Sequence, residues 1–241
     1  NRKAETLGLT NTHFVDVHGL DDSNQQYTTA LDVAKLSRHY ISNHPEALAY
    51  HSTKEFTYAD ITQRNRNGLL WNYPGVDGLK TGHLSKVGYN LVATAKQNNM
   101  RLIAVVLGAD SENIRENEVR KLLNYGFRNF ESVKASQVVS PIETTIYKGK
   151  VNTVDVVPLE DVSMLIPVGA KDQVRVVKNI NKPLVAPIKN GQSVGELKFY
   201  WQDELLAETE ATVSEDVPKA GFFKSLWDSI RLLFAKIFAK K

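Results

Sequence analysis

The stretch Val76-Asp77-Gly78-Leu79-Lys80-Thr81-Gly82 is followed by two apolar runs rich in β-branched residues, at 88–95 and 101–108. Polar residues separate the runs, and this pattern predicts two sheet strands joined by a tight connection. A Lys-Thr-Gly triplet that leads into such a hairpin suits acyl transfer. The lysine supplies a fixed positive charge, the threonine hydroxyl can hold a substrate carboxylate, and the glycine lets a ligand backbone approach the strand closely.

Helices are predicted on both sides of this hairpin. The first covers residues 29–41 behind the potential caps Thr28 and Thr29 and ends near Pro45. The second begins around Ser111, with Asp110 or Ser111 as its cap. Its apolar residues at helical spacing are Ile114, Val119, Leu122, Leu123 and Phe127. Strands packed against a long helix predict an α/β sandwich over residues 1–131.

The segment between the first helix and the triplet contains shorter elements. Residues 56–58 suggest a short strand, and the polar stretch 63–68 precedes what reads as an apolar strand from Leu69. Tyr73-Pro74-Gly75 is typical of a turn.

From 132 to 217 the pattern changes to short β-branched runs separated by prolines and glycines. The runs lie at 144–147, 151–157, 174–177 and 197–201. Regularly spaced short strands with turn signals predict a small all-β domain. Nothing in this stretch resembles a catalytic set, so we expect it to act as a spacer or protein contact.

Residues 218–241 predict an amphipathic helix. At ~100° per residue, the apolar residues fall within one arc of about 140°. They are Phe223, Leu226, Trp227, Ile230, Leu233, Phe234, Ile237 and Phe238. Lys224, Asp228, Arg231 and Lys236 lie opposite, with Leu232 as the exception. Spanning a bilayer would bury these charges, so we expect the helix of 221–241 to lie flat on an anionic membrane. The alternative is a helix docked on the protein's own core.

Composition narrows the functional classes. The chain has 241 residues and a net charge of +3, yet residues 219–241 alone carry +5, which includes Lys240 and Lys241. The main body is therefore slightly acidic, and a nucleic-acid-binding face is not expected. Cysteine is absent, the six histidines lack metal-ligand spacing, and no Gly-rich phosphate loop occurs. We expect no metal and no cofactor.

Several segments together carry a family resemblance. They are 7–12 (Leu-Gly-Leu-Thr-Asn-Thr), 18–21 (His-Gly-Leu-Asp), 69–71, 76–82 and 88–93. With the β-rich stretch and the terminal helix, they closely resemble the serine-type D-alanyl-D-alanine carboxypeptidases, the low-molecular-mass penicillin-binding proteins. The resemblance implies a β-lactamase/transpeptidase fold in 1–131, here without its N-terminal elements.

The resemblance also implies a reaction and a set of site residues. In the family, a serine attacks the penultimate D-Ala carbonyl of a peptidoglycan stem peptide, D-Ala leaves, and the acyl-enzyme is hydrolysed. Lys80 would keep a positive potential near the serine, and Thr81 would bind the terminal carboxylate. Gly82 belongs to the same triplet, and the backbone N–H of His83 would complete the oxyanion hole. Leu84 stands where relatives often carry threonine.

Two arginines match the family's carboxylate-recognition positions. Arg115 falls near the start of a helix, where the macrodipole disfavours a cation, so an anionic partner such as a peptide C-terminus is expected. Local pairing with Glu112 or Glu118 is the alternative. Arg66 lies in a polar connection, and only the resemblance singles it out. Implied partners are stem peptides ending in D-Ala-D-Ala and β-lactams.

One departure concerns the nucleophile. The family's serine lies in a Ser-x-x-Lys motif followed by Ser-x-Asn, and no Ser-x-x-Lys occurs in this sequence. Ser111-Glu112-Asn113 is better explained by helix capping, and Ser23-Asn24 lacks the spacer. We therefore expect the C-terminal portion of an enzyme that an upstream signal peptide sends to the outer face of the cytoplasmic membrane.

Two alternatives stay open at this point. A non-catalytic, membrane-bound peptidoglycan-binding module would fit the missing nucleophile. A β-lactamase would share the triplet, but such enzymes are normally soluble single domains, which residues 132–241 argue against.

Overall fold

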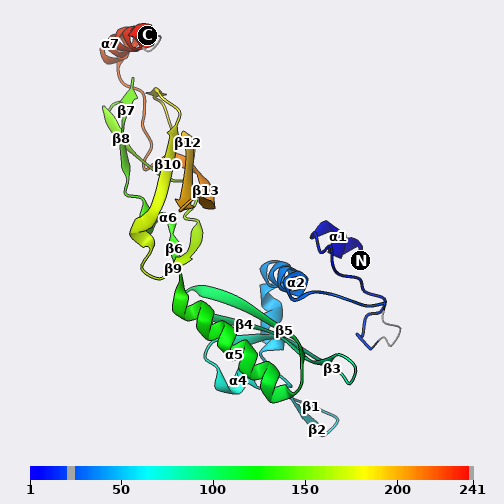
Figure 1. Ribbon diagram of the computed structural model, residues 1–241. Coiled ribbons are helices and arrows are strands. Elements are labelled where there is room, and N and C mark those ends of the chain that lie inside the picture. Colours follow the sequence, from blue (N-terminus) through cyan, green and yellow to red (C-terminus); the bar gives the residue numbers. More distant parts are fainter. Residues whose placement is uncertain (21–24, 239–241) are drawn as a thin grey trace. The chain divides into compact units, whose positions relative to one another are not determined.

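The computed structural model describes residues 1–20 and 25–238, with the side chains of 235–238 left aside. The predictions for Asp21, Ser23-Asn24, Lys240 and Lys241, and for the side chains of Lys236, Ile237 and Phe238, lie outside what is described. Contacts divide the chain into two compact units, Asn1–Asn129 and Phe130–Lys241 (Figure 1). Each unit is described by itself.

The first unit is built on an antiparallel sheet of three strands in the order β3-β4-β5. They are β3 (Val76–Leu84), β4 (Gly88–Gln97) and β5 (Met100–Ala109). The predicted hairpin is therefore confirmed, and the Lys-Thr-Gly triplet lies inside β3 itself. Asn98 and Asn99 form the turn between β4 and β5 with φ of 46° and 62°, a region that asparagine tolerates better than most residues.

One face of this sheet is covered by helix α5 (Glu112–Asn129). Ser111 Oγ accepts a hydrogen bond from the N–H of Ile114 at 3.2 Å, so Ser111 caps the helix as predicted. Val119 and Leu123 are buried against Leu91 and its neighbours in β4. The helix thereby forms the main core of the unit.

The predicted apolar face of α5 is wrong at two positions. Ile114 and Leu122 are 43% and 48% exposed, whereas Arg115 is buried. The buried line runs through Arg115, Val119 and Leu123, at i, i+4 and i+8. The sequence pattern is right at Val119 and Leu123, but Arg115 and not Ile114 continues this row toward the start of the helix.

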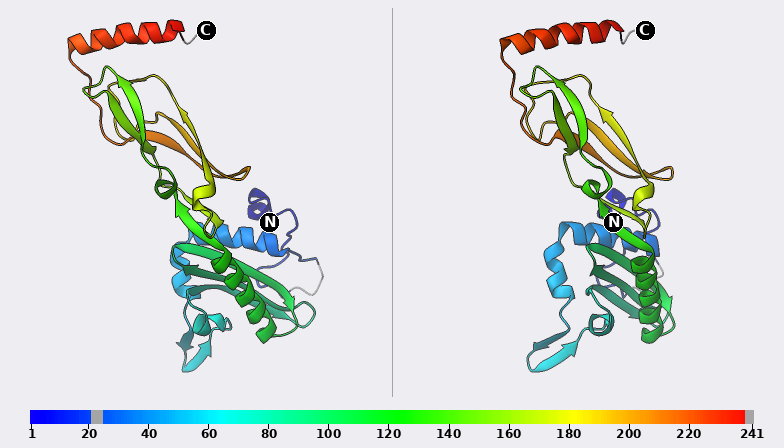
Figure 2. Two further views of the ribbon diagram at one scale, coloured as in Figure 1. Left: turned by 60° about the vertical axis from the view of Figure 1, so that its left-hand side comes forward. Right: turned by 90° about the vertical axis from the view of Figure 1, so that its left-hand side faces the viewer.

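Helices also lie on the opposite face. Helix α2 (Ala30–Asn43) begins at Thr29, whose hydroxyl accepts from the N–H of Asp32, and it ends before Pro45 as predicted. A 3-10 turn η1 (Pro45–Ala47) leads into α3 (Leu48–His51). Thr94 of β4, on the face away from α5, lies beside Leu48 and His51 around Gly78. The unit is thus the expected α/β sandwich (Figure 2).

The remaining elements of this unit are short. They are α1 (Arg2–Thr6), the hairpin β1 (Glu55–Tyr58) and β2 (Ile61–Arg64), and α4 (Leu69–Asn72). The prediction of a strand beginning at Leu69 is wrong, because these residues form the helical turn α4. The side chain of Asn67 accepts from the N–H of Leu69 at 3.3 Å, which bends the chain at that point.

The second unit contains the predicted all-β domain. Its main sheet has six strands in the order β10-β12-β13-β8-β7-β11, and β6 pairs with β9 in a separate sheet. The strands are β6 (Phe130–Lys134), β7 (Ile142–Tyr147), β8 (Thr153–Pro158), β9 (Ser163–Pro167), β10 (Val174–Ile180), β11 (Leu184–Val185), β12 (Gly195–Trp201) and β13 (Glu204–Val213). Short helices α6 (Ala135–Val138) and η2 (Lys171–Gln173) connect them.

This sheet has its own core, in which Ile166, Leu197, Phe199 and Val213 are fully buried. Helix α7 (Phe222–Phe238) follows the last strand. Among the residues that the structure describes, no helix has both the length and the apolar character needed to cross a membrane.

Candidate active site

The Lys-Thr-Gly triplet occupies β3, which is an edge strand of the described sheet. An edge strand leaves alternate backbone N–H and C=O groups unpaired, and these can bind an extended ligand. Lys80 and His83 are exposed and Thr81 is half-buried. The Lys80 ammonium donates to the carbonyl oxygen of Thr81.

Strand alternation divides the triplet between the two faces of the sheet. Tyr89 lies on the face covered by α5, because the Arg115 guanidinium carbon is 5.7 Å from the centre of its ring. His83 is directly opposite Tyr89, and the two rings stack with centroids 3.9 Å apart. Thr81 therefore shares this face with His83 and Arg115, whereas Lys80 points to the other face.

An ion pair fixes the beginning of β3. Both terminal nitrogens of Arg101 donate to the Asp77 carboxylate at 2.7 Å, and one of them also donates to Thr94 Oγ1 at 2.9 Å. Arg101 is in β5 and Thr94 in β4, so this bidentate pair ties all three strands together just ahead of the triplet.

A polar bracket, residues 65–69, supports the same strand. The Asn67 amide is buried and donates to the carbonyl oxygen of Gly78 at 3.0 Å. Asn65 donates to the carbonyl oxygens of His51 and Thr53. The bracket is thereby attached to β3 at one point and to the end of α3 at another.

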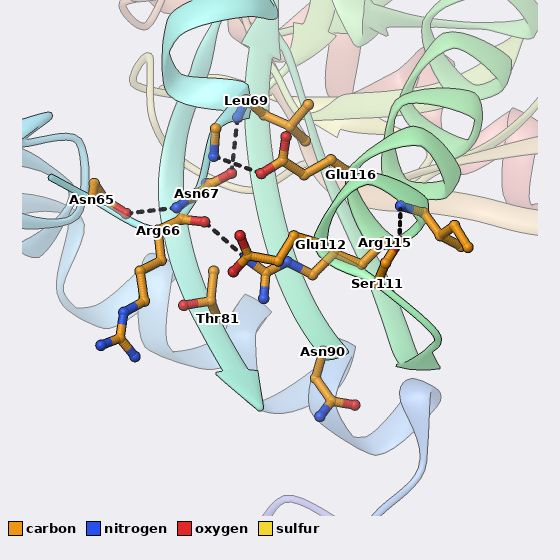
Figure 3. A network of polar contacts seen from close by, with 12 residues as sticks. Asn65, Arg66, Asn67, Leu69, Thr81, Asn90, Ser111, Glu112, Arg115 and Glu116 are labelled. Carbon is orange, nitrogen blue, oxygen red and sulfur yellow. Dashed lines mark hydrogen bonds and ion pairs between the residues drawn. The ribbon is translucent and has the colours of Figure 1, made fainter. Parts of the chain in front are cut away.

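Helix α5 holds the bracket from the other side (Figure 3). The Glu116 carboxylate accepts from the N–H of Gly68 at 2.9 Å. A Cβ added at Gly68 would stand 2.6 Å from a Glu116 oxygen, so only glycine fits beside this carboxylate without displacing it.

Arg115 is the most buried charged side chain of the site, at 1% exposed. Its Nη2 donates to the carbonyl oxygen of Arg66 at 2.8 Å and lies 3.2 Å from Glu112 Oε1. Its Nε is buried without a hydrogen-bond partner in the described structure. A buried N–H without an acceptor is costly to stability.

The structure thus brings together several of the predicted site residues. The carbonyl of Arg66 is held by Arg115, while the exposed Arg66 side chain makes none of the hydrogen bonds or ion pairs described. Thr81 lies on the face of the sheet on which Arg115 is found (Figure 3). Sequence reasoning missed the supporting residues Asn67 and Glu116, although a glycine next to an asparagine is a turn signal.

A groove of about 510 Å³ adjoins the end of the triplet. Gly82 and His83 form one side of it, and Phe14, Tyr27 and Thr28 of the N-terminal segment form another. Over residues 1–20 and 25–238, no group of three metal-ligating side chains comes together.

Comparisons with known proteins agree with this architecture. The D-alanyl-D-alanine carboxypeptidase family profile matches residues 1–111, and the profile of the penicillin-binding protein 5 C-terminal domain matches residues 127–219. D-alanyl-D-alanine carboxypeptidase DacA of Haemophilus influenzae is 42% identical over 243 residues. The match covers 99% of this chain but only 62% of that relative.

Solved structures give the same result. Penicillin-binding protein 5 from Haemophilus influenzae superposes with a TM-score of 0.67 at 41% identity, over 91% of this chain and 64% of that one. Penicillin-binding protein D2 from Listeria monocytogenes, solved in its cefotaxime-bound form, has a TM-score of 0.50 at 35% identity and covers 53% of each chain. The chain therefore belongs to the family of D-alanyl-D-alanine carboxypeptidases, and it corresponds to the C-terminal part of the relatives that it matches.

Proposed function

We propose that this chain supplies one wall of the active site of a serine-type D-alanyl-D-alanine carboxypeptidase. The observation that carries the proposal is the edge strand β3, with Lys80 on one face and Thr81 on the face that also carries His83 and Arg115. The reaction removes the terminal D-Ala of a peptidoglycan stem peptide. The nucleophilic serine attacks the penultimate carbonyl, D-Ala leaves as the amine, and water then cleaves the ester.

The triplet contributes charge and hydrogen bonds to this reaction. The Lys80 ammonium lowers the cost of forming the serine alkoxide and takes part in proton transfer. The backbone N–H of His83, on the edge strand, donates to the oxyanion of the tetrahedral intermediate. The Thr81 hydroxyl donates to the substrate's terminal carboxylate, and Gly82 leaves room for the peptide backbone.

Arg115 and Arg66 provide the positive potential for that carboxylate. Burial makes the Arg115 charge effective, since little water surrounds it to screen the field. The Arg66 side chain is exposed, and its guanidinium takes part in none of the hydrogen bonds or ion pairs of the described residues. β-Lactams present a carboxylate next to a reactive acyl carbon, and the cefotaxime-bound relative supports their binding here as well.

The experiment uses the complete protein that contains this chain. Release of D-Ala from a pentapeptide is measured for Lys80→Ala and Thr81→Val, with Lys96→Ala as the matched control. Lys96 is an exposed lysine at the far end of β4 from the triplet. We expect at least ~100-fold loss for Lys80→Ala, from lost proton transfer and electrostatics, and roughly 10- to 100-fold for Thr81→Val. Full activity in Lys80→Ala would refute the assignment.

We also propose that α7 holds the protein on the outer face of the cytoplasmic membrane. The described apolar residues of the arc are exposed, with Phe223 at 85% and Trp227 at 64%. Apolar burial at ~25 cal/mol per Å² then drives binding to the headgroup region. Replacing Trp227 and Phe234 with serine should release the protein from vesicles even at low salt. Unchanged co-sedimentation of this double variant would mean that another surface binds the lipid.

A further inference from the structure

Helix α7 contacts the all-β domain through its charged side. Asp228 is 3% exposed, and its Oδ2 accepts from the backbone N–H of Lys148 at 2.7 Å. Lys148 has a φ of 58°, so it forms the tight turn after β7. Arg231 lies 3.5 Å from the other Asp228 oxygen and stacks over the ring of Tyr147.

The turn of residues 147–151 is also tied to the chain that leads into the helix. The N–H of Ala220 donates to the carbonyl oxygen of Lys148 at 2.7 Å, and that of Lys150 donates to Pro218 at 3.1 Å. The Lys224 ammonium reaches the carbonyl oxygen of Val151 at 3.2 Å. The turn and the first half of α7 therefore form one hydrogen-bonded body.

This arrangement reverses the usual packing of an amphipathic helix, whose apolar face normally covers the core. Here the polar face is packed and the apolar face is free, with Leu233 and Phe234 at 60% and 55% exposed. Leu232, the apolar exception on the charged side, is half-buried. Asp228 is the only acidic residue from 219 to 241, and its carboxylate accepts a hydrogen bond from the turn.

We propose that α7 and the turn 147–151 bind an anionic bilayer as a single unit, with Asp228 as the residue that holds them together. This inference rests on the proposed membrane role of α7. A helix whose apolar arc enters the boundary of the acyl chains has its polar face at the level of the headgroups. The turn stacked on that polar face then places Lys148 and Lys150 beside lipid phosphates.

The charges fit this partner. Five cations belong to the turn, to the chain that leads into the helix and to the first half of α7, namely Lys148, Lys150, Lys219, Lys224 and Arg231. Two of them come from the β-domain and lie far outside the helix in sequence. The membrane-binding surface is thus larger than the terminal helix, and its orientation is set by the fold of the domain.

A charge test compares matched pairs of lysines in the full chain. Lys148→Gln/Lys150→Gln should weaken binding to vesicles containing anionic lipid by about fivefold per lysine. Lys171→Gln/Lys178→Gln, with the same charge change elsewhere in the domain, should alter binding by less than twofold. Neither pair should affect binding to neutral vesicles. Equal behaviour of the two pairs on anionic vesicles would overturn the inference.

A second test probes the height of the turn above the bilayer. Because the sequence contains no cysteine, a polarity-sensitive dye can be attached to Lys150→Cys or, as control, to Lys171→Cys. On vesicles, the dye at position 150 should report an interfacial environment, and the dye at 171 should report water. With Trp71 and Trp201 replaced by phenylalanine, the fluorescence of Trp227 records helix insertion independently.

Adding Asp228→Ala should return the dye at position 150 to water while Trp227 stays inserted. Asp228→Asn keeps an oxygen acceptor for the Lys148 N–H and should preserve the interfacial signal. If Trp227 inserts but position 150 remains in water in the otherwise unchanged chain, the inference is wrong. If Trp227 does not insert at all, the membrane proposal itself fails.

Discussion

Replacing Arg115 with methionine should separate substrate recognition from stability. Arg115 is 1% exposed, donates to the carbonyl oxygen of Arg66, and has a buried Nε without a partner. Methionine fills a similar volume without charge. The lost charge-assisted hydrogen bond costs ~1.5–3 kcal/mol, while removing a buried unsatisfied N–H returns ~1–3 kcal/mol. The two effects largely offset each other, so the free energy of unfolding should change by no more than about 2 kcal/mol.

Activity should respond quite differently to the same substitution. If Arg115 supplies the positive charge that the terminal carboxylate needs, its loss removes ~1.5–3 kcal/mol of binding in the transition state. This corresponds to a roughly 10- to 150-fold fall in kcat/KM. The fall should occur only for substrates with a free C-terminus.

The assay measures kcat/KM of the complete protein on two matched peptides, one ending in a free carboxylate and one in an amide. Urea unfolding of the same variants supplies the stability. An equal loss on both peptides would refute the reasoning, because it would mean that Arg115 acts only by holding the carbonyl of Arg66. Arg115→Ala is the poorer variant, since a cavity would add its own cost in stability.

Three further predictions follow from the same structure. Gly68→Ala should cost ~1–2 kcal/mol of stability by displacing the Glu116 carboxylate from the Gly68 N–H. When Glu116 is already replaced by alanine, urea unfolding should show that adding Gly68→Ala lowers the stability little further. The 241-residue chain alone, which lacks Ser-x-x-Lys, should gain no mass on incubation with a penicillin; a stoichiometric adduct would reveal an unrecognised nucleophile. The hydrogen bond from the Ser136 N–H lowers the pKa of Asp161. The ionised Asp161 therefore stabilises the fold fully above about pH 5, and this stabilisation is lost as the pH falls through the lowered pKa. The stability of Asp161→Asn should accordingly differ from that of the wild type at neutral pH but not in acid, and a difference that persists in acid would contradict this prediction.

The strands of the sheet could be predicted because their signal is local. The runs at 88–95 and 101–108 are apolar and β-branched, and both lie in strands of the structure. Strand β13 (Glu204–Val213) is less visible in sequence, because Glu208 and Glu210 alternate with small residues in its middle. Its burial depends on pairing with β12 and β8, which the local pattern does not contain.

The supporting residues of the site could not be predicted in the same way. Leu69 reads as the start of a strand, but Asn67 accepts its N–H and produces a helical turn. The need for glycine at position 68 arises from Glu116, which is 48 residues away in sequence. Such residues become visible only when the fold has brought the bracket and α5 together.

Arg115 and Asp228 show one physical reason for this limit. Each is a charged residue on the packed side of a helix, and each forms its main hydrogen bond with a backbone group of a distant loop. Arg115 holds the carbonyl of Arg66, and Asp228 holds the N–H of Lys148. Every residue except proline has the same backbone groups, so the amino-acid types in either loop do not predict which residue forms the hydrogen bond. In both cases the buried charged residue fixes a loop that carries a cationic side chain, Arg66 in one and Lys148 in the other, which an apolar residue at the same helix position could not do.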